Sequence, residues 1–338
     1  MTSILREAAQ SAAVVRRQLA GNRESVRGLG ATLRKLAPRA VITCARGSSD
    51  HAATYARYLL ETRGGILASS GAPSVSSVYS AQTDLRGTLC LAISQSGRSP
   101  DLLSAAEAAR AAGAVVVALV NADDSPLAAR ADHLIPLRAG TERSVAATKS
   151  HVASLAAILH LVAEWQEDDE LRTALEALPQ GLEEAWSLDW SAAIAPLRDA
   201  KSLFVLGRGL GLSVALEAAL KLKETCRLHA EGFSAAEFRH GPMAMVEAGF
   251  PVLLFAQDDE TWNSSAALAA ELTAARAALI VAGCEAPGAL FLPTIAAHPV
   301  VQPILMIQSF YRLVEALARA RGMDPDQPPH LSKITETV

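Results

Sequence analysis

Two spacings of apolar residues alternate along the chain and predict the elements of an α/β protein. Short β-branched runs without polar alternation are typical of strands buried on both faces of a parallel sheet. Longer runs rich in Ala and Leu predict the helices between them. The predicted strands are 40–44, 89–93, 115–120, 133–137, 202–206, 251–255 and 278–282. The predicted helices are 4–36, 50–63, 100–112, 145–164, 211–226, 261–276 and 300–321.

The strand and helix pattern restarts near residue 202, and three landmarks repeat at one offset of 162 residues. The matching pairs are Arg46-Gly47 with Arg208-Gly209, Gln95 with Gln257, and strand 115–120 with 277–282. A shared offset predicts duplicated domains, each a parallel sheet covered by helices on both faces. The turn-forming sequence Pro179-Gln180-Gly181 punctuates the region between them. We therefore expect a helical segment at 1–38, domains at 39–180 and 181–321, and a tail at 322–338.

The composition of the chain argues against several classes of function, among them nucleic-acid binding and metal binding through cysteines. Half of the 338 residues are hydrophobic, which is ample for two cores. The net charge of −4 gives no basic signature of a nucleic-acid partner. The four cysteines lie far apart and lack metal-ligand spacing, so free thiols in a reducing compartment are expected. With no signal-peptide or membrane-spanning run, we expect a soluble, cytoplasmic protein.

The sequence Ser94-Gln95-Ser96-Gly97-Arg98-Ser99-Pro100 follows a predicted strand and opens a predicted helix. Ser99 suits the N-cap and Pro100 the first helical position. Backbone N–H groups and the helix dipole favour an anion at such an end, and the hydroxyls add donors. A phosphate monoester fits this loop, although an ordinary capped turn would carry the same residues. Ser48 and Ser49 follow the neighbouring strand and could add hydroxyls.

A second set of candidates lies in the later half of the chain. Glu217, Lys221 and Glu224 share one face of a predicted helix, either as a solvated stripe or as a carboxylate base beside a cation. His240 precedes a Gly-Pro step, which suits a structural histidine or one presented at a pocket edge. Lys333 lies in the tail, where it would be a nucleophile only if burial or charge lowered its pKa.

Six further patterns occur in order along the chain. They are Ser94-Gln95-Ser96-Gly97, Thr141-Glu142-x-x-Val145-Ala146-x-Thr148-Lys149, Gly207-Arg208-Gly209, Ala215-Leu216-Glu217-x-Ala219-Leu220-Lys221-Leu222-Lys223-Glu224, Glu237-Phe238-Arg239-His240-Gly241-Pro242 and Leu331-x-Lys333. Together these six motifs resemble the sugar isomerase (SIS) domain family, in the two-domain form of the isomerase half of glutamine–fructose-6-phosphate transaminases. The resemblance also covers the stand-alone amino-sugar-phosphate deaminases and runs from about residue 40 to the end.

The resemblance implies a role for each candidate. Glu224 is the expected base that moves a proton between C1 and C2, and Lys221 assists it. His240 opens the sugar ring from the neighbouring subunit of a homodimer, and Lys333 forms or supports an imine. The residues expected to bind the sugar or its phosphate are Ser48, Ser49, Ser94, Gln95, Ser96, Ser99, Val145 and Glu217. No metal or other cofactor is implied.

Two departures from the transaminases favour a stand-alone deaminase or deglycase. About 40 residues precede the first predicted strand, so we expect no glutaminase domain and no glutamine as nitrogen donor. Arg98 stands where those enzymes usually have an acidic residue. The expected reaction converts glucosamine 6-phosphate to fructose 6-phosphate and ammonia. The alternatives are a galactosamine-6-phosphate deaminase, a fructosamine-6-phosphate deglycase, another phosphosugar aldose–ketose isomerase, and a sugar-phosphate-binding regulator without turnover.

Overall fold

The computed structural model describes residues 1–81 and 83–333, which group into two compact units. The β1–β5 unit comprises Ser11–Glu142, Lys149–Glu176 and the described end of the tail, 331–333. The β6–β10 unit comprises Met1–Gln10, Arg143–Thr148 and Ala177–His330. The domain bounds expected from the sequence stay a prediction.

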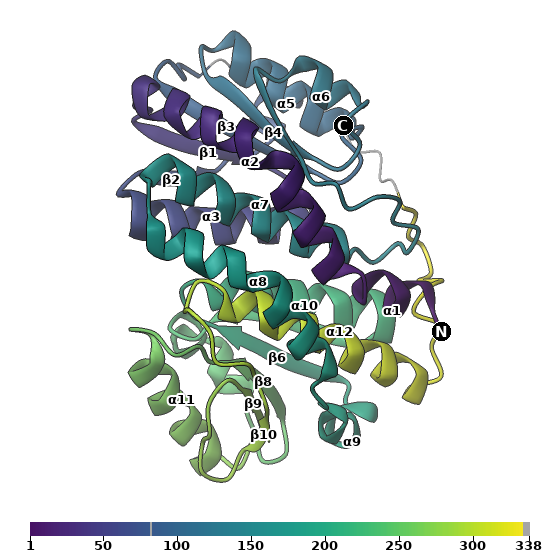
Figure 1. Cartoon of the computed structure of the whole chain (residues 1–338). Helices are drawn as coiled ribbons and strands as arrows, with labels where there is room; N and C mark the ends of the chain where they lie inside the picture. Colours follow the sequence, from purple (N-terminus) through teal and green to yellow (C-terminus); the bar gives the residue numbers. More distant parts are fainter. Residues whose placement is uncertain (82, 334–338) are drawn as a thin grey trace. The chain divides into compact units, whose positions relative to one another are not determined.

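The β1–β5 unit contains a five-stranded parallel sheet in the order β2-β1-β3-β4-β5 (Figure 1). Its strands are β1 (Ala40–Cys44), β2 (Leu67–Ser70), β3 (Thr88–Ser94), β4 (Val115–Val120) and β5 (His133–Pro136). Its helices are α2 (Ser11–Leu36), α3 (Ser48–Gly64), α4 (Ser74–Ser77), α5 (Pro100–Ala111), α6 (Pro126–Arg130) and α7 (Lys149–Gln166). Helices α3 and α5 cover opposite faces of the sheet, as right-handed crossovers require, and α7 packs on α3 and α2.

The β6–β10 unit has its own parallel sheet in the order β10-β9-β8-β6-β7. Its strands are β6 (Ser202–Gly207), β7 (His229–Ser234), β8 (Pro251–Phe255), β9 (Ala278–Ala282) and β10 (Leu290–Leu292). Its helices are α1 (Ser3–Ala8), α9 (Ile194–Arg198), α10 (Gly211–Cys226), α11 (Trp262–Ala274) and α12 (Gln302–Ala320). Three 3₁₀ turns complete it, η1 (Ser191–Ala193), η2 (Glu237–His240) and η3 (Pro242–Met245). The predicted α/β class, with two parallel sheets and flanking helices, is confirmed.

The two sheets share one strand order and nearly one register, which supports the predicted duplication. Ile42 of β1 pairs with Cys90 of β3, and Phe204 of β6 pairs with Val252 of β8, an offset of 162 for both partners (204 − 42 and 252 − 90). The fourth strand differs, because Val252 pairs with Leu279 where Cys90 pairs with Val116 (279 − 116 = 163). The alignment of 115–120 with 277–282 was therefore wrong by one residue.

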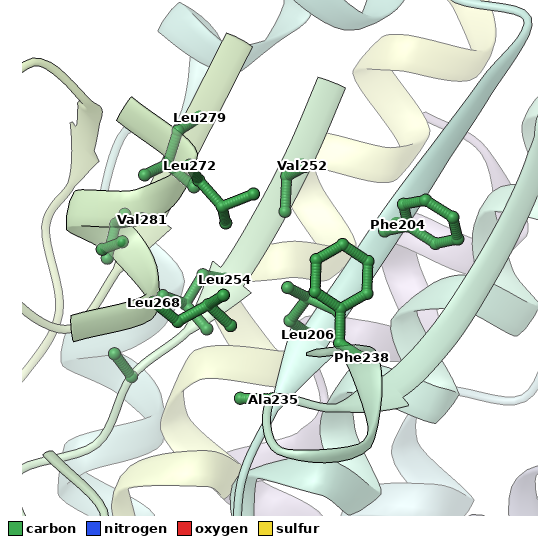
Figure 2. Packing of buried hydrophobic residues seen from close by; sticks show 12 residues of the cluster. Phe204, Leu206, Ala235, Phe238, Val252, Leu254, Leu268, Leu272, Leu279 and Val281 are labelled. Atoms are coloured by element: carbon green, nitrogen blue, oxygen red, sulfur yellow. The ribbon is translucent and has the colours of Figure 1, made fainter. Parts of the chain in front are cut away.

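A cluster of buried apolar side chains lies on one face of the β6–β10 sheet (Figure 2). Phe204 of β6 meets Phe238 of η2 edge to face, with ring centroids 5.0 Å apart. Such aromatic pairs contribute about 0.5–1.5 kcal/mol beyond the area that they bury. Phe238 is fully buried and thereby fixes the short turn that carries His240.

The single helix predicted at 4–36 is wrong, because the chain breaks between α1 and α2. The side-chain amide of Gln308 donates to the carbonyl of Ala8 at 3.0 Å, an acceptor that a continuous helix would use internally. Asp326 accepts the first backbone N–H groups of α1, from Ser3 at 2.6 Å and Ile4 at 2.9 Å. Contacts distant in sequence thus hold α1 as a separate element, which local periodicity does not reveal.

The turn predicted at Pro179-Gln180-Gly181 is also wrong, because α8 (Asp169–Ser187) continues through it. The apolar side chains of α8 recur at helical spacing and are buried, and this packing outweighs the hydrogen bond lost at Pro179. Gly181 lies close to α12, since an added Cβ would stand 3.1 Å from the Leu305 side chain. The glycine therefore serves helix packing rather than a turn.

Candidate functional site

The loop after β3 has the local structure expected of an anion-binding turn. The hydroxyl of Ser94 accepts the backbone N–H of Gly97 at 2.9 Å, and that of Ser96 accepts the N–H of Arg98 at 3.3 Å. Gly97 has φ +62°, and an added Cβ would stand 2.2 Å from the Ser125 hydroxyl. Only glycine fits such a position without displacing its neighbour.

Ser99 holds the predicted N-cap position of α5, with Pro100 after it. Among the described residues its hydroxyl makes no capping hydrogen bond, while its carbonyl accepts the N–H of Leu103. Gln95 and Ser96 are half-buried. The N-terminus of α5 and the hydroxyls beside it form a suitable environment for a phosphate group.

Ser48 and Ser49 begin α3 directly after β1, which pairs with β3 in the same sheet. Carboxyl ends of adjacent parallel strands lie at one edge, so both serine-rich loops share that edge. The guanidinium of Arg46 joins them, because its Nε donates to Asp101 in the first turn of α5 at 2.8 Å. The Asp101 side chain is 1% exposed and that of Arg46 is 55% exposed. This ion pair was not predicted from the sequence.

The predicted stripe on α10 is a buried charge cluster and not a solvated face. Lys221 is fully buried, with its Nζ 3.4 Å from Glu217 Oε1 and 2.5 Å from Glu224 Oε2. The Glu217 side chain is also fully buried, whereas that of Glu224 is 16% exposed. Burial alone would lower the pKa of Lys221, but the two carboxylates more than compensate and raise it. Lys221 therefore stays a cation that orients Glu224, the one member of the cluster with access to solvent.

His240 ends η2 and is exposed. Within the described part of the chain it makes no hydrogen bond or ion pair with the α10 cluster. The turn is fixed by buried Phe238 and by an ion pair of Arg239 with Glu271 at 2.9 Å. The predicted catalytic histidine, His240, is thus held on an ordered turn. Within the described β6–β10 unit it makes no contact of these kinds with the predicted base, Glu224.

Val145 lies in an irregular loop, because the helix predicted from residue 145 begins at Lys149. The loop is bound by Glu7 of α1, whose carboxylate accepts the backbone N–H of Arg143 at 2.6 Å and of Ser144 at 3.1 Å. Glu7 is 7% exposed. It was missed in the sequence, where it forms part of an ordinary helical pattern far from the loop that it holds.

Lys333 is paired instead of solvated. Its Nζ lies 3.1 Å from Oε2 of Glu142, whose side chain is fully buried. The same carboxylate accepts the backbone N–H and the hydroxyl of Ser150 at the start of α7. Glu142 was not predicted as a site residue, although it stands in one of the six motifs, because its role depends on a partner 191 residues away.

Each unit thus brings together one part of the predicted set. The β1–β5 unit holds the serine-rich edge and the pair of Lys333 with Glu142. The β6–β10 unit holds Glu217, Lys221, Glu224, His240 and Val145. Among residues 1–81 and 83–333, no His, Cys, Asp and Glu side chains group in a way that could hold a metal ion. No helix in that part of the chain is both long and apolar enough to span a bilayer.

The sequence pattern of the SIS domain matches residues 37–163 and 196–289 of the chain. A glutamine–fructose-6-phosphate aminotransferase of Pyrobaculum aerophilum is 36% identical over 90% of this chain and 52% of its own length. The chain accordingly spans about half the length of the curated relatives that it matches.

Among solved structures, a protein of Silicibacter pomeroyi assigned as a phosphosugar isomerase is 45% identical. It superposes with a TM-score of 0.92 over 96% of this chain and 100% of its own. A glucosamine-6-phosphate deaminase of Thermotoga maritima shares the fold with a TM-score of 0.80, at 21% identity and with 99% and 100% of the two chains covered.

Proposed function

The chain belongs to the SIS domain family, and from that premise we propose that it is a phosphosugar isomerase that deaminates an amino-sugar 6-phosphate. Glucosamine 6-phosphate is the proposed substrate, and fructose 6-phosphate and ammonia are the proposed products. The observation that carries this proposal is the α10 cluster, in which a buried cation holds a partly exposed carboxylate.

Proton transfer between neighbouring carbons needs a base that is fixed in place and accessible on one side. Glu224 meets both requirements, because Lys221 binds one of its oxygens while its side chain remains 16% exposed. In the proposed reaction Glu224 removes the C2 proton of the open-chain amino sugar. The electron pair forms a double bond between C1 and C2, and the C1 carbonyl oxygen takes up a proton from water, which gives an enolamine. The same carboxylate returns the proton to C1, leaving a C2 imine that water converts to the ketone and ammonia.

The remaining residues divide between binding and ring opening. The loops at Ser48–Ser49 and Ser94–Ser99 hold the phosphate through hydroxyls, backbone N–H groups and the α5 dipole. The ring oxygen of a closed sugar must gain a proton while the C1 hydroxyl loses one, and His240 can exchange both. Lys333 forms or supports an imine with the keto sugar, and Val145 and Glu217 line the sugar.

We further propose a cytoplasmic homodimer in which His240 serves the partner's site. Its exposure and its separation from the α10 cluster within its own unit support this arrangement. The test mixes a His240→Ala protein with a Glu224→Gln protein after each dimer has been dissociated. Random reassociation should restore about a quarter of the wild-type rate, since half of the dimers are hybrids with one intact site. Mixtures that stay inactive would contradict the shared site.

The direct test of the function incubates the protein with glucosamine 6-phosphate and follows ammonia and fructose 6-phosphate together. Wild type should release both in equal amounts, and Glu224→Gln should release neither while still binding the sugar phosphate. A wild type that binds this sugar but releases neither product would overturn the substrate.

A panel of galactosamine 6-phosphate, fructosamine 6-phosphate and simple aldose phosphates separates the alternative activities. If the wild type binds these sugars but exchanges no hydrogen at C1 or C2 with any of them, the protein is a sugar-phosphate-binding regulator. That outcome would contradict the enzymatic proposal.

A further inference from the structure

Lys333 is held by a charge contact near the end of the described tail. Its ammonium lies 3.1 Å from Glu142 Oε2, and its side chain is 24% exposed. Leu331, two residues earlier, is 47% exposed, so burial of that side chain does not hold the tail in place. The carboxylate of Glu142 is thus a charged partner in direct contact with the lysine nitrogen.

Glu142 is itself rigidly placed. One carboxylate oxygen accepts the backbone N–H of Ser150 at 3.1 Å, and the other accepts the Ser150 hydroxyl at 2.6 Å. Both bonds lie in the first turn of α7, an 18-residue helix whose dipole favours a negative charge there. Lys149 adds a further restraint, because its Nζ donates to the carbonyl of Thr141 at 2.7 Å.

We propose that Glu142 is a positioning residue that holds Lys333 and accepts the proton that this lysine must lose before it reacts. The inference rests on the proposed function, in which Lys333 forms an imine with a keto sugar phosphate. An ammonium has no electron pair for attack, so a proton acceptor in contact with it is required. Glu142 Oε2 is a carboxylate oxygen at hydrogen-bond distance, and the side chain that carries it is fully buried.

The imine step balances with this acceptor. The ammonium of Lys333 gives a proton to Glu142, and the freed electron pair forms a bond to the carbonyl carbon of the sugar. The π electrons move to the carbonyl oxygen. The lysine nitrogen starts with three protons and keeps one in the protonated imine. The other two leave on the former carbonyl oxygen as water, and one of them is the proton that Glu142 took up and returns.

The experiment traps the imine by borohydride reduction with fructose 6-phosphate and measures the adduct at Lys333 by mass spectrometry. Glu142→Gln keeps the shape of the side chain but removes its charge. It should slow trapping about 10²-fold at neutral pH, the lower end of what a positioned proton acceptor contributes. The rate should recover as the pH is raised, because hydroxide can then deprotonate the lysine. Affinity for fructose 6-phosphate should change little.

The matched control is Ser150→Ala, which removes one hydrogen bond to the same carboxylate oxygen but leaves the contact with Lys333. It should trap at close to the wild-type rate. If Glu142→Gln fails to fold, Glu142→Asp takes its place, because the shorter side chain keeps the charge but moves it away from Lys333. Slower trapping without weaker binding is again expected. Trapping in the folded variant at the wild-type rate and pH dependence would overturn the inference.

The experiments can refute the proposed function and the role of Glu142 independently of each other. A wild type that converts glucosamine 6-phosphate without an adduct at Lys333 would refute the role of Glu142 and keep the deaminase. An adduct that depends on Glu142 in a protein that releases no ammonia would refute the deaminase and keep the inference.

Discussion

The serine-rich edge of the β1–β5 unit and the α10 cluster of the β6–β10 unit stand on sheets of the same strand order, yet their chemistry differs. The first offers hydroxyls and backbone N–H groups around the half-buried turn after β3. The second buries an ammonium between two carboxylates. Neutral donors on a helix N-terminus suit binding of an anion, and a buried charge cluster suits proton transfer. The duplicated fold therefore sets where loops emerge, while particular residues set what they do.

The corresponding loop of the second sheet illustrates this divergence. Gln257 follows β8 where Gln95 follows β3, but Asp258 and Asp259 come next instead of a serine and a glycine. Asp259 accepts hydrogen bonds from the backbone N–H of Thr261 at 2.8 Å and from the Thr261 hydroxyl. Its carboxylate therefore occupies donors of the same turn. Two carboxylates at this edge would repel a phosphate. Phosphate binding is accordingly expected at the β3 loop alone.

The largest effect is expected from breaking the charge cluster. Lys221→Met should leave Glu217 buried without its cation and lower the free energy of unfolding by about 3–5 kcal/mol, as measured by urea denaturation. Lys223→Met is the matched control, since Lys223 is exposed on the same helix and should change stability by less than about 0.5 kcal/mol. A small effect of Lys221→Met would show that the cluster does not depend on its central charge.

A substitution in the loop after β3 should chiefly weaken the binding of the sugar phosphate. Gly97→Ala places a methyl group against Ser125 at a positive φ and should distort the loop, at a cost of about 1–3 kcal/mol in stability. Sugar-phosphate affinity, measured by calorimetry, should fall by about two- to tenfold if half of that cost is lost from the loop geometry.

Gly28→Ala serves as the control for this loop variant. Its added Cβ meets no atom within 4 Å on helix α2, so stability should rise by up to about 1 kcal/mol. Equal affinities of the Gly97→Ala protein and the wild type would remove this loop from the binding site.

The smallest expected effect is on the pH dependence of stability, and it comes from comparing two buried basic side chains, Lys221 and His160. Lys221 keeps its charge because carboxylates surround it, but burial lowers the pKa of His160 to about 4, with Arg23 acting in the same direction and Glu164 opposing it. Between about pH 6.5 and pH 4, the His160 imidazole is therefore protonated in the unfolded chain but neutral in the folded chain. Stability is present in full above this window and is lost as the pH falls through it. Denaturation at pH 7 and pH 5 should show a weaker loss in His160→Gln than in wild type, whereas the exposed His229→Gln should match wild type.

The central elements could be predicted from the sequence because their physical signal is local. The inner strands are buried on both faces and read as apolar runs, and α10 was predicted with its observed bounds. The edge strands β2, β7 and β10 were missed, because they are partly exposed and lack such runs. The break at Gln10 and the helix through Pro179 depend on packing against distant elements.

The residues of the candidate site also divide into those with a local sequence signal and those that depend on distant contacts. The loop at Ser94 and the stripe at Glu217 could be predicted, because each lies within a few residues of sequence. Burial of Lys221 could not, since helical spacing alone also fits a solvated stripe. Glu7 and Glu142 were missed because each meets a partner more than 130 residues away along the chain. Contacts of that range leave no periodic signal.

The most direct test of the account follows the proton that Glu224 is proposed to move. Glucosamine 6-phosphate deuterated at C2 is incubated with the protein, and NMR measures deuterium leaving C2 together with ammonia release. Wild type should release deuterium from C2 in step with ammonia, and Glu224→Gln should be slower by about 10²–10⁴-fold. Ammonia released with deuterium still on C2, or unchanged release in the variant, would contradict the central claim.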